Sequence, residues 1–595
     1  MIKANAEVVF ECAWEVCNKV GGIHTVVTSK ARHMLDFYKN YFLIGPYFKG
    51  RSELVFERKS PSELLKELFY ELSSELGIKC HYGKWLIEGE PNVILLEFDS
   101  LKYKTNDLKK WFWDNFKIDS MNTGWDFEEP MLWSYAIGIL IDKYKKKSNQ
   151  ENIIAHFHEW MTGFGLLYLK KENPSVKTIF TTHATILGRS IASSGRHLYS
   201  ELENVNPDIE AKNYNIVGKF TAERAAAQNS HVFTTVSEIT GKECKYLLGR
   251  EPDVLTLNGL DLDMFPTVEE TALLHIKNRR KLREYITYHF FPYYEFDLSH
   301  NLSFCICGRP ELKNKGVDVF IRALGKLNKE LKENPIRKRT VTVFIWLLYG
   351  EKDSKIELIE NKEHFNHIQN TIRQDADKIL NNVLYDFLED EKFGNKEIIS
   401  KKFELRLKKD LTLFKKQGNP LICSQNIGDE SKNQVINMLS KEGLDNSRDN
   451  PVKVIFYPCY LDGNDSLLNL DIYQAMSGCH LTVFPSFYEP WGYTPLESAA
   501  LSVPTITTDL AGFGKFIKPK NDSKKGKEGI FVIDRYQKSD EETVVSLFET
   551  MKHFCTLRHS ERVQNKVNAK DLSFLADWKF LIENYIQAHN LALER

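Results

Sequence analysis

Two glutamates, Glu489 and Glu497, lie eight positions apart in the stretch YEPWGYTPLES, residues 488–498. Two prolines, a glycine and bulky aromatic residues separate them, which is typical of a rigid turn. A carboxylate on such a turn can accept hydrogen bonds from hydroxyl groups and stabilise an oxocarbenium-like transition state. The types and spacing of these residues therefore indicate chemistry on a sugar.

The same turn is predicted to present a helix start to its ligand. The pattern TPLE predicts a capping box, with Thr494 as N-cap, Pro495 at the first helical position and Glu497 three residues after the cap. The positive end of that helix, with the backbone N–H groups of Gly492, Tyr493 and Thr494, favours a phosphate. Glu497 has two open interpretations, a cap carboxylate or a ligand to a sugar. A sugar together with a diphosphate is a nucleotide sugar.

A glycine pair near the N-terminus is a second candidate for phosphate contact. In VCNKVGGIHTVV, Gly21 and Gly22 allow the backbone to approach a ligand closely, and Lys19 adds a positive charge. An ordinary turn before a helix remains the alternative.

Further cations follow predicted strands. Arg189 comes after KTIFTT, and Arg309, Lys313 and Lys315 come after LSFCICG. Guanidinium and ammonium groups at strand ends suit a diphosphate. A surface arginine in the first case and a plain basic loop in the second are the alternatives.

Histidines also occupy strand ends. HFHEW places His156, His158 and Glu159 after one strand, and His183 follows the next. The H-x-H pair raises the question of a metal, but no third ligand lies near it in the sequence, so we expect no metal site and instead histidines that line a cleft. Asn258 is predicted in a turn that closes the first series of strands.

The elements that must position these residues alternate between strand and helix. Apolar, β-branched runs predict one series of strands at AEVVFECAW, VILLEF, IIAHFHEW, KTIFTTH and HVFTTVS, and a second at LSFCICGR, VTVFIWLLYG, VKVIFYP, LTVFPS and VPTITTD. This pattern predicts an α/β protein with two doubly wound domains, whose ligands bind at the carboxyl ends of the strands. Between residues 351 and 450, charged segments with helical apolar spacing predict an inserted pair of amphipathic helices, which could mediate self-association.

Composition excludes several classes of protein. With 595 residues and a formal net charge of -1, the chain lacks the basic excess of a dedicated nucleic-acid binder. No apolar run is long enough for a signal peptide or a membrane span. The ten cysteines show no metal or disulfide spacing, so we expect a reduced, cytoplasmic protein.

The sequence resembles the eukaryotic-type glycogen synthases. The resemblance spans about residues 8–516 in unchanged order and is carried by FECAWEVCNKVGGIHTVV, AHFHEWMTG, TIFTTHATILGR, AERAAAQNSHVFTTVSEIT, KNKGVDVFI and above all GCHLTVFPSFYEPWGYTPLESAALSVPTITTDLAGFG. It implies a GT-B fold, with two Rossmann-like domains that face each other across a cleft. We expect the first at residues 1–270, joined by a final helix at 577–595, and the second at 271–576.

The resemblance also implies an activity, namely transfer of glucose from UDP-glucose to the nonreducing 4-hydroxyl of an α-1,4-glucan, with retention of configuration and no metal. The family pattern places Glu489 and His183 at the transferred glucose and Glu497 at the nucleotide ribose. It places Arg189, Arg309 and Lys315 around the diphosphate, and Lys19 and Gly22 at the donor. The full expected set also contains Gly21, His158, Asn258, Trp491, Gly492, Tyr493 and Thr494 as substrate-binding residues, and Glu489, Lys315, Arg309 and His183 as catalytic residues.

Two departures from the family pattern carry expectations of their own. The arginine-rich helix that binds glucose 6-phosphate in the family reads RVQNKVNAKDLS here. Basic residues still recur at i, i+4 spacing on one helix face, at Arg558, Arg562, Lys566 and Lys570, and the first three are the candidates for an allosteric site. Lysine lacks the bidentate geometry of arginine, so activation by glucose 6-phosphate is in doubt. Ile472 replaces a tyrosine near the base, which keeps an ADP-glucose-dependent, starch-type synthase open. A catalytically silent glucan-binding scaffold is the third alternative. A glycogenin-like primer protein and a homo-oligomer, dimer or tetramer, are further expectations.

Overall fold

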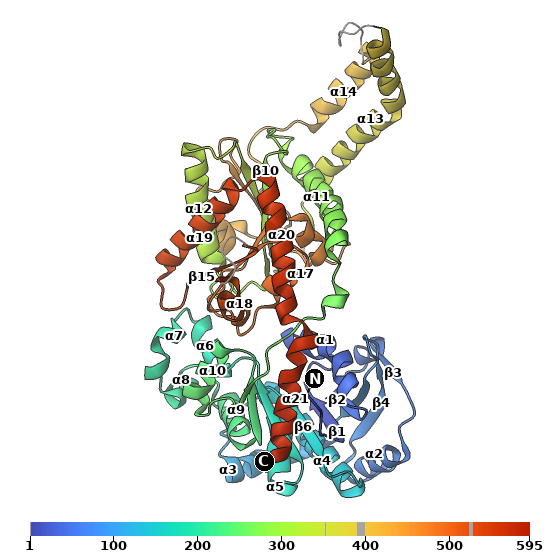
Figure 1. Ribbon diagram of the computed structural model, residues 1–595, viewed down its shortest axis with the longest axis vertical. Coiled ribbons are helices and arrows are strands. Elements are labelled where there is room, and N and C mark those ends of the chain that lie inside the picture. Colours follow the sequence, from blue (N-terminus) through green and yellow to red (C-terminus); the bar gives the residue numbers. More distant parts are fainter. Residues whose placement is uncertain (1, 351–352, 390–398, 523–527) are drawn as a thin grey trace.

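The computed structural model describes residues 2–350, 353–389, 399–522 and 528–595. Two parallel-rich sheets lie in separate halves of an elongated molecule (Figure 1). Each half is an α/β domain with helices on both faces of its sheet, so the predicted fold class is confirmed.

The first domain is built on a nine-stranded sheet with the order β3-β4-β5-β2-β1-β6-β7-β8-β9. Its strands pair in parallel except where β4 meets β3 and β5. The strands are β1 (Val8–Cys12), β2 (Tyr41–Pro46), β3 (Phe56–Arg58), β4 (Lys79–Trp85), β5 (Asn92–Glu97), β6 (Ile153–His158), β7 (Lys177–Thr182), β8 (Val232–Thr235) and β9 (Val254–Leu255). The central strands β1 and β6 are buried along their whole length, as expected of strands covered on both faces.

The helices of this domain are α1 (Gly22–Phe37), α2 (Glu63–Leu76), α3 (Thr105–Phe116), α4 (Trp125–Lys147), α5 (Gly163–Glu172), α6 (Ile186–Ser193), α7 (Leu198–Glu201), α8 (Pro207–Asn213), α9 (Val217–Asn229) and α10 (Glu238–Glu243). The last helix of the chain, α21 (Trp578–Glu594), also packs here, against α1 and against β6 to β9. Its buried face carries Trp578, Tyr585 and His589.

The second domain has a six-stranded parallel sheet with the order β12-β11-β10-β13-β14-β15. These strands are β10 (Asn301–Gly308), β11 (Thr340–Leu347), β12 (Val452–Phe456), β13 (Leu481–Val483), β14 (Thr505–Thr508) and β15 (Ile530–Ile533). Its helices are α11 (Val268–Phe290), α12 (Val317–Glu333), α15 (Gln434–Lys441), α16 (Ile472–Gly478), α17 (Tyr493–Ala500), α18 (Gly512–Asp522), α19 (Asp540–Thr556) and α20 (His559–Ser573).

The predicted insertion contains two helices, α13 (Ile356–Glu389) and α14 (Lys401–Phe414). They project from the second domain as an arm, at the end of the molecule remote from the first domain (Figure 1). Residues 351–352 and 390–398 of the insertion lie outside the described residues.

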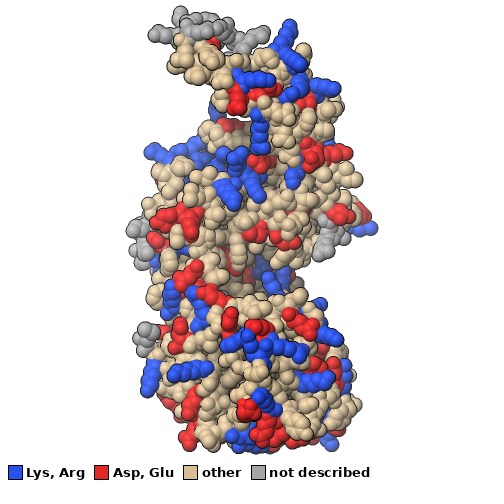
Figure 2. Space-filling view, turned by 90° about the vertical axis from the view of Figure 1, so that its right-hand side faces the viewer, with Lys and Arg blue, Asp and Glu red and all other residues tan. Residues whose placement is uncertain are grey.

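The chain crosses between the domains twice, and the two crossings pair with each other. Leu260 donates its N–H to the Ala576 carbonyl at 2.9 Å, and Trp578 donates to the Leu260 carbonyl at 3.1 Å. Figure 2 shows the molecular surface narrowing between the two domains. Among the described residues, no helix is long and apolar enough to cross a membrane.

Candidate active site at the domain boundary

Glu489 lies in the loop between β13 and α17, where the second domain faces the first. The loop turns at Gly492, whose φ of 104° lies in the left-handed region that favours glycine. A Cβ at Gly492 would lie 3.2 Å from Cγ of Glu489, so a side chain there would press on the carboxylate-bearing residue.

The expected capping box is wrong. The helix α17 begins at Tyr493 with Gly492 as its N-cap, and no side chain caps it. Thr494 and Pro495 therefore lie two residues further into the helix than predicted, because the backbone at Gly492 already makes the turn.

Lys315 pairs with Glu489. Its ammonium group forms an ion pair with the Glu489 carboxylate, and both side chains are about one-fifth exposed. Lys315 is held there because it precedes α12 at Gly316, another residue with positive φ. Lys313, by contrast, pairs with Asp540 and points toward α19. The site thus combines a carboxylate and a cation at one point of the domain boundary.

Glu497 bonds to a tyrosine rather than to its own helix. Its carboxylate accepts a hydrogen bond of 2.9 Å from the Tyr473 hydroxyl, and burial raises the pKa of Glu497 although Lys19 opposes this. The neighbouring Ile472 packs against the core of the second domain. Tyr473 instead lines an interdomain cavity of about 600 Å³, with its ring edge-on to Phe265.

The glycine-rich loop contacts the second domain directly. Glu15 accepts hydrogen bonds from the backbone N–H of Gly21 at 2.6 Å and of His24 at 2.9 Å. Arg309 reaches across and donates to the Val20 carbonyl at 3.0 Å. A Cβ at Gly21 would lie 2.9 Å from the Glu15 carboxylate, so a side chain there would displace Glu15 from its present position. Glu15 is a residue that our sequence analysis missed.

His183 ends a chain of buried polar groups. Its Nε2 lies 2.9 Å from Nδ1 of His158, whose Nε2 lies 2.7 Å from the Glu11 carboxylate. Lys30 pairs with the same carboxylate, and both side chains are fully buried. Burial disfavours the charge of Glu11, yet Lys30 and His158 hold its pKa well below the ordinary value.

This series of hydrogen bonds determines which ring nitrogens of His158 and His183 carry a hydrogen. The ionised Glu11 only accepts, so His158 carries its hydrogen on Nε2 and offers the Nδ1 lone pair to His183. His183 then donates from Nε2 and keeps a lone pair on Nδ1. Burial lowers the pKa of both histidines, so both rings are neutral. His158 is 1% exposed and lies behind His183. That it binds substrate directly stays a prediction.

A third metal-ligating group does lie beside the H-x-H pair. Ligand atoms of Glu11, His156 and His158 all lie within 4.8 Å of one another, which the sequence spacing does not reveal. Lys30 already neutralises the Glu11 carboxylate, and a cation there would have to displace its ammonium group. The cluster therefore fits a structural ion pair better than a metal site.

Glu159 is a functional candidate that we did not select. It has a φ of 68°, rare for a residue with a side chain, and its carboxylate accepts from the backbone N–H of His183 at 2.8 Å and of Ala184 at 3.2 Å. Burial raises the pKa of Glu159 to about 7, while Arg189 opposes the shift. Its position directly after the H-x-H pair at the end of a strand is the feature of the sequence that could have identified it.

Two other expected substrate contacts do not face the cleft with their side chains. The indole of Trp491 is 3% exposed and packs against Phe513 and Phe516 in the core. Asn258 is 4% exposed, and its Oδ1 is buried. The Tyr493 hydroxyl donates a hydrogen bond of 3.2 Å to the carbonyl of Gly259, beside the first crossing between the domains.

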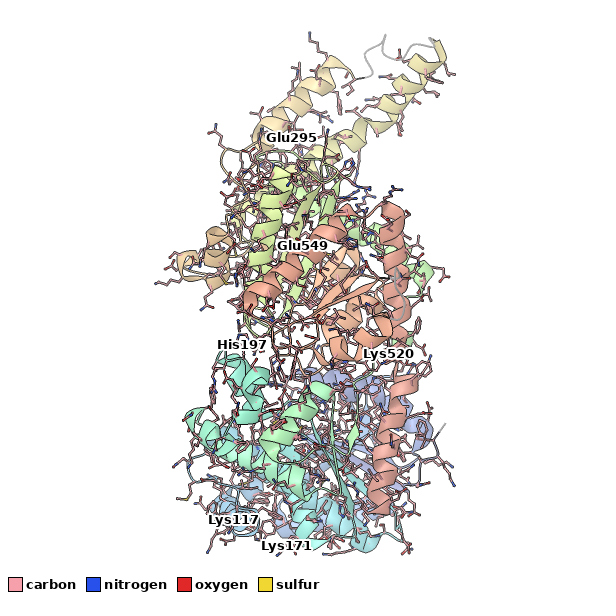
Figure 3. All side chains as sticks on the ribbon, turned by 60° about the vertical axis from the view of Figure 1, so that its left-hand side comes forward. Lys117, Lys171, His197, Glu295, Lys520 and Glu549 are labelled. Atoms are coloured by element: carbon pink, nitrogen blue, oxygen red, sulfur yellow. The ribbon has the colours of Figure 1, made fainter. Side chains whose placement is uncertain are left out.

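The loop of Glu489 is also tied to the first domain. Tyr488 donates to the Glu243 carboxylate at 3.1 Å, and Asn314 donates to the Ser193 hydroxyl at 2.9 Å. Phe487 packs edge-on to His197, which lies at the domain junction (Figure 3). These contacts hold the two domains together on one side of the site.

The chain matches a family model described as glycogen synthase over residues 11–595. The chain belongs to the glycogen synthase family. It is 35% identical over 593 residues to the glycogen [starch] synthase of Caenorhabditis elegans, covering 99% of this chain and 88% of that protein. It is also 35% identical over 607 residues to glycogen [starch] synthase isoform 2 of Saccharomyces cerevisiae, covering 98% and 86%.

The fold of this glycogen synthase is similar to a solved catalytic domain of starch synthase IV from Arabidopsis thaliana bound to ADP and acarbose, with a TM-score of 0.53, 14% identity and full coverage of both chains. The predicted resemblance is confirmed, and the protein is a glycosyltransferase. The scaffold and starch-type alternatives are not favoured.

A basic pocket lies on another face of this glycogen synthase, between α11 and α20. Its volume is about 330 Å³, and its lining includes Arg562, Lys566, Arg279, His275 and His480. The Nε2 atom of His480 is buried without a hydrogen-bond partner among the described residues. Of the three expected allosteric residues, Arg558 is the N-cap of α20 and does not line the pocket.

Proposed function

We propose that the protein transfers glucose from UDP-glucose to the nonreducing 4-hydroxyl of an α-1,4-glucan, with retention of configuration. The observation that carries this proposal is the pairing of Glu489 with Lys315 beside the start of α17, at the boundary of two domains in a glycogen synthase fold. The carboxylate suits the positive charge that develops on the glucosyl carbon, and the cations suit the departing diphosphate.

The bonds can be assigned without a covalent enzyme intermediate. The bond from the glucosyl carbon C1 to the phosphate oxygen breaks, and a bond from C1 to the acceptor O4 forms on the same face. The acceptor hydroxyl proton passes to the leaving phosphate. Arg189, Arg309 and Lys315 stabilise the negative charge of UDP, and His183 offers its Nδ1 lone pair to a glucose hydroxyl.

Donor choice follows from the pocket beside Glu497. Since Ile472 is partly buried against the core of the second domain, we propose that Tyr473 supplies the aromatic contact near the base, with its hydroxyl fixed on Glu497. The test is glucosyl transfer to soluble glycogen from UDP-glucose and from ADP-glucose, by wild type and Glu489→Ala, with NMR of the new linkage. Transfer from UDP-glucose, α-linked and lost in the variant, is expected. Preferential use of ADP-glucose would overturn the donor assignment.

We further propose that transfer needs no metal ion, because Lys30 already balances the charge of Glu11 and the diphosphate has its own cations. Activity after dialysis against EDTA should equal untreated activity. Loss on EDTA treatment that is restored by a divalent ion would contradict this proposal.

The pocket between α11 and α20 supports a regulatory anion site. Burial and mutual repulsion with Arg279 lower the pKa of Lys566 to about 7, so the cations gain stabilisation when an anion enters. We propose that this pocket binds a sugar phosphate such as glucose 6-phosphate, with Arg279 and the histidines compensating for the missing arginines. Unchanged rate and donor affinity at saturating glucose 6-phosphate would contradict it.

Three expectations about the cellular context stay proposals. The arm of α13 and α14 exposes Leu380, Leu384, Tyr385 and Leu388, which supports a homo-oligomer formed through these helices. A cytoplasmic location and dependence on a glycogenin-like primer are proposed from the family alone. Comparison of transfer to bare maltooligosaccharides and to a glucosylated primer protein tests the last of these.

A further inference from the structure

A buried carboxylate of the first domain, Glu243, connects that domain to the loop of Glu489. It is the last residue of α10 and is 0% exposed. Its atom Oε2 accepts a hydrogen bond of 2.6 Å from the Thr185 hydroxyl and one of 3.1 Å from the Tyr488 hydroxyl. Thr185 belongs to the first domain and Tyr488 to the second, so a single oxygen atom joins them. The other atom, Oε1, accepts from the Tyr199 hydroxyl at 2.6 Å, within the first domain.

On the first-domain side, Glu243 holds the start of α6. Thr185 is the N-cap of this helix, and its hydroxyl accepts from the Gly188 N–H at 3.0 Å while it donates to Glu243. A Cβ at Gly188 would lie 2.3 Å from the Glu243 carboxylate, so a side chain there would displace the carboxylate. The same turn carries His183, two residues before the cap, and Arg189, whose N–H donates to the Thr185 carbonyl at 3.0 Å. The position of the cap therefore affects both residues.

On the second-domain side, Tyr488 connects Glu243 to the segments that carry the ion pair of Glu489 and Lys315. Tyr488 directly precedes Glu489 in the chain, and its backbone N–H donates to the Asn314 carbonyl at 3.2 Å. Asn314 in turn directly precedes Lys315. The bond from the Tyr488 hydroxyl to Glu243 thus orients both segments relative to the first domain.

Two other carboxylates hold the turn before α6 but stay within the first domain. Glu223 is fully buried and accepts from the Ile186 N–H at 2.9 Å and from the Thr182 hydroxyl at 3.0 Å. Glu159 accepts from two further backbone N–H groups of the turn. Among the hydrogen bonds of the described residues, Glu243 alone of these three carboxylates also accepts from the second domain. It is therefore the member of the set that can align one domain with the other.

The burial of Glu243 is unfavourable in itself. Burial raises the pKa of Glu243 to about 7, and the hydroxyl groups of Thr185, Tyr199 and Tyr488 oppose the shift. A buried carboxylate destabilises a fold unless hydrogen bonds or opposite charges compensate for its lost hydration. Ionisable groups in such surroundings are concentrated at functional sites. A role in the alignment of the reaction site accounts for a carboxylate at this position.

We propose that Glu243 is a positioning residue for glucosyl transfer, which aligns the turn of His183 and Arg189 with the Glu489 loop through its hydrogen bond to Tyr488. This inference rests on the proposed function. Because Glu243 is fully buried, it acts through these neighbours and does not touch the substrates. Loss of the bond across the boundary should therefore slow the transfer step without weakening the binding of the donor.

The test removes single hydroxyl groups that donate to Glu243. Tyr488→Phe removes the bond across the domain boundary and should lower kcat about 10-fold with an unchanged KM for UDP-glucose, because alignment contributes to the transition state and not to ground-state binding. Tyr199→Phe is the matched control, since it removes a bond to the same carboxylate within the first domain, and it should keep the wild-type kcat. Equal losses of kcat in the two variants would overturn the inference, because they would show that Glu243 only stabilises the fold.

A double-mutant cycle tests whether the effect passes through Glu243. Glu243→Gln should also lower kcat, because its amide nitrogen cannot accept a hydrogen bond. Addition of Tyr488→Phe to Glu243→Gln should then cause no further loss, and additive losses would overturn the inference. If thermal unfolding shows that Glu243→Gln does not fold, the comparison of Tyr488→Phe with Tyr199→Phe still decides, since both variants keep their rings. Wild-type kcat in Tyr488→Phe would overturn the inference, whereas absence of any transfer by the wild type would overturn the proposed function.

Discussion

At the scale of single residues, the pair of Glu489 and Lys315 decides whether the site can act. The positive start of α17 and the ammonium group of Lys315 both favour the ionised carboxylate of Glu489. In the free enzyme, each group is therefore expected to stabilise the other. During transfer, Glu489 is expected to stabilise the positive charge of the transition state and Lys315 the negative charge.

Glu489→Gln should lower kcat about 10³-fold, as expected for loss of one preorganised electrostatic group, with little change in thermal stability. Initial rates of transfer to glycogen check this. Glu295→Gln is the matched control, because Glu295 is 71% exposed on its side chain and pairs only at the surface with Lys415 (Figure 3). Retention of full kcat by Glu489→Gln would contradict the assigned role.

The buried pair of Glu11 and Lys30 allows stability to be separated from positioning. Lys30→Met should lower the free energy of unfolding by about 3–5 kcal/mol, because it leaves an uncompensated buried carboxylate. The double variant Glu11→Leu/Lys30→Met should recover much of that loss in urea unfolding. Transfer should remain impaired in the double variant, since His158 no longer has the acceptor that fixes the His183 tautomer. Recovery of both stability and kcat would show that Glu11 has no positioning role.

At the scale of elements, Gly492 sets the relation between the Glu489 loop and α17. Gly492→Ala should lower kcat about 10²-fold, because its Cβ would displace Glu489 and the left-handed backbone is strained for alanine. Gly443→Ala is the matched control, with a similar positive φ of 69° and nothing within 4 Å of its Cβ. If both variants kept wild-type kcat, steric pressure on Glu489 would be excluded.

Prediction from the sequence was more successful for secondary-structure elements than for contacts between side chains. Buried apolar runs gave most of the parallel strands, because burial on both faces leaves a continuous signal. The strands β2, β3, β4, β9 and β15 were not predicted. Of these, β4 is half-exposed and antiparallel to its neighbours, with a mixed pattern. The cap at Thr494 was wrong because Gly492, two residues earlier, takes a left-handed turn and is the N-cap. Glu11 and Lys30 meet only through the packing of α1 on β1, which no local pattern encodes.

The pocket between α11 and α20 makes a prediction about pH at this same scale. Lys566, with its pKa of about 7, carries its charge below pH 7 and loses it above, so affinity for a sugar phosphate should fall between pH 7 and 8.5. The phosphate itself is already a dianion in this range and does not offset the loss. Activation constants for glucose 6-phosphate across this range check it. Lys566→Arg should flatten the profile, and an equally steep profile in that variant would contradict the assignment.

At the scale of the whole molecule, two crossings at Leu260 and Trp578 and the contacts of the Glu489 loop hold the domains together. The reaction site, the cavity beside Tyr473 and the cavity lined by Tyr199, Tyr246 and Tyr536 all take walls from both domains. Each of these sites therefore requires both domains in the arrangement that the structure shows, whereas the arm of α13 and α14 lies apart from all of them (Figure 1).

Because the arm lies apart from the reaction site, we predict that substitutions in the arm can abolish oligomer formation without loss of glucosyl transfer. Leu384 and Leu388 are 52% and 69% exposed on α13, and burial of such residues is a driving force for association of helices. Leu384→Lys/Leu388→Lys should shift the mass measured by light scattering to that of one chain, while kcat per chain stays within about 2-fold, since surface substitutions away from a site rarely disturb it. Leu54→Lys, at a residue 79% exposed in the first domain, should keep the wild-type mass. An unchanged mass in the arm variant would show that the arm does not assemble the enzyme. Loss of both mass and kcat would show that assembly is needed to close the domains, since the arm itself contributes no residue to the reaction site.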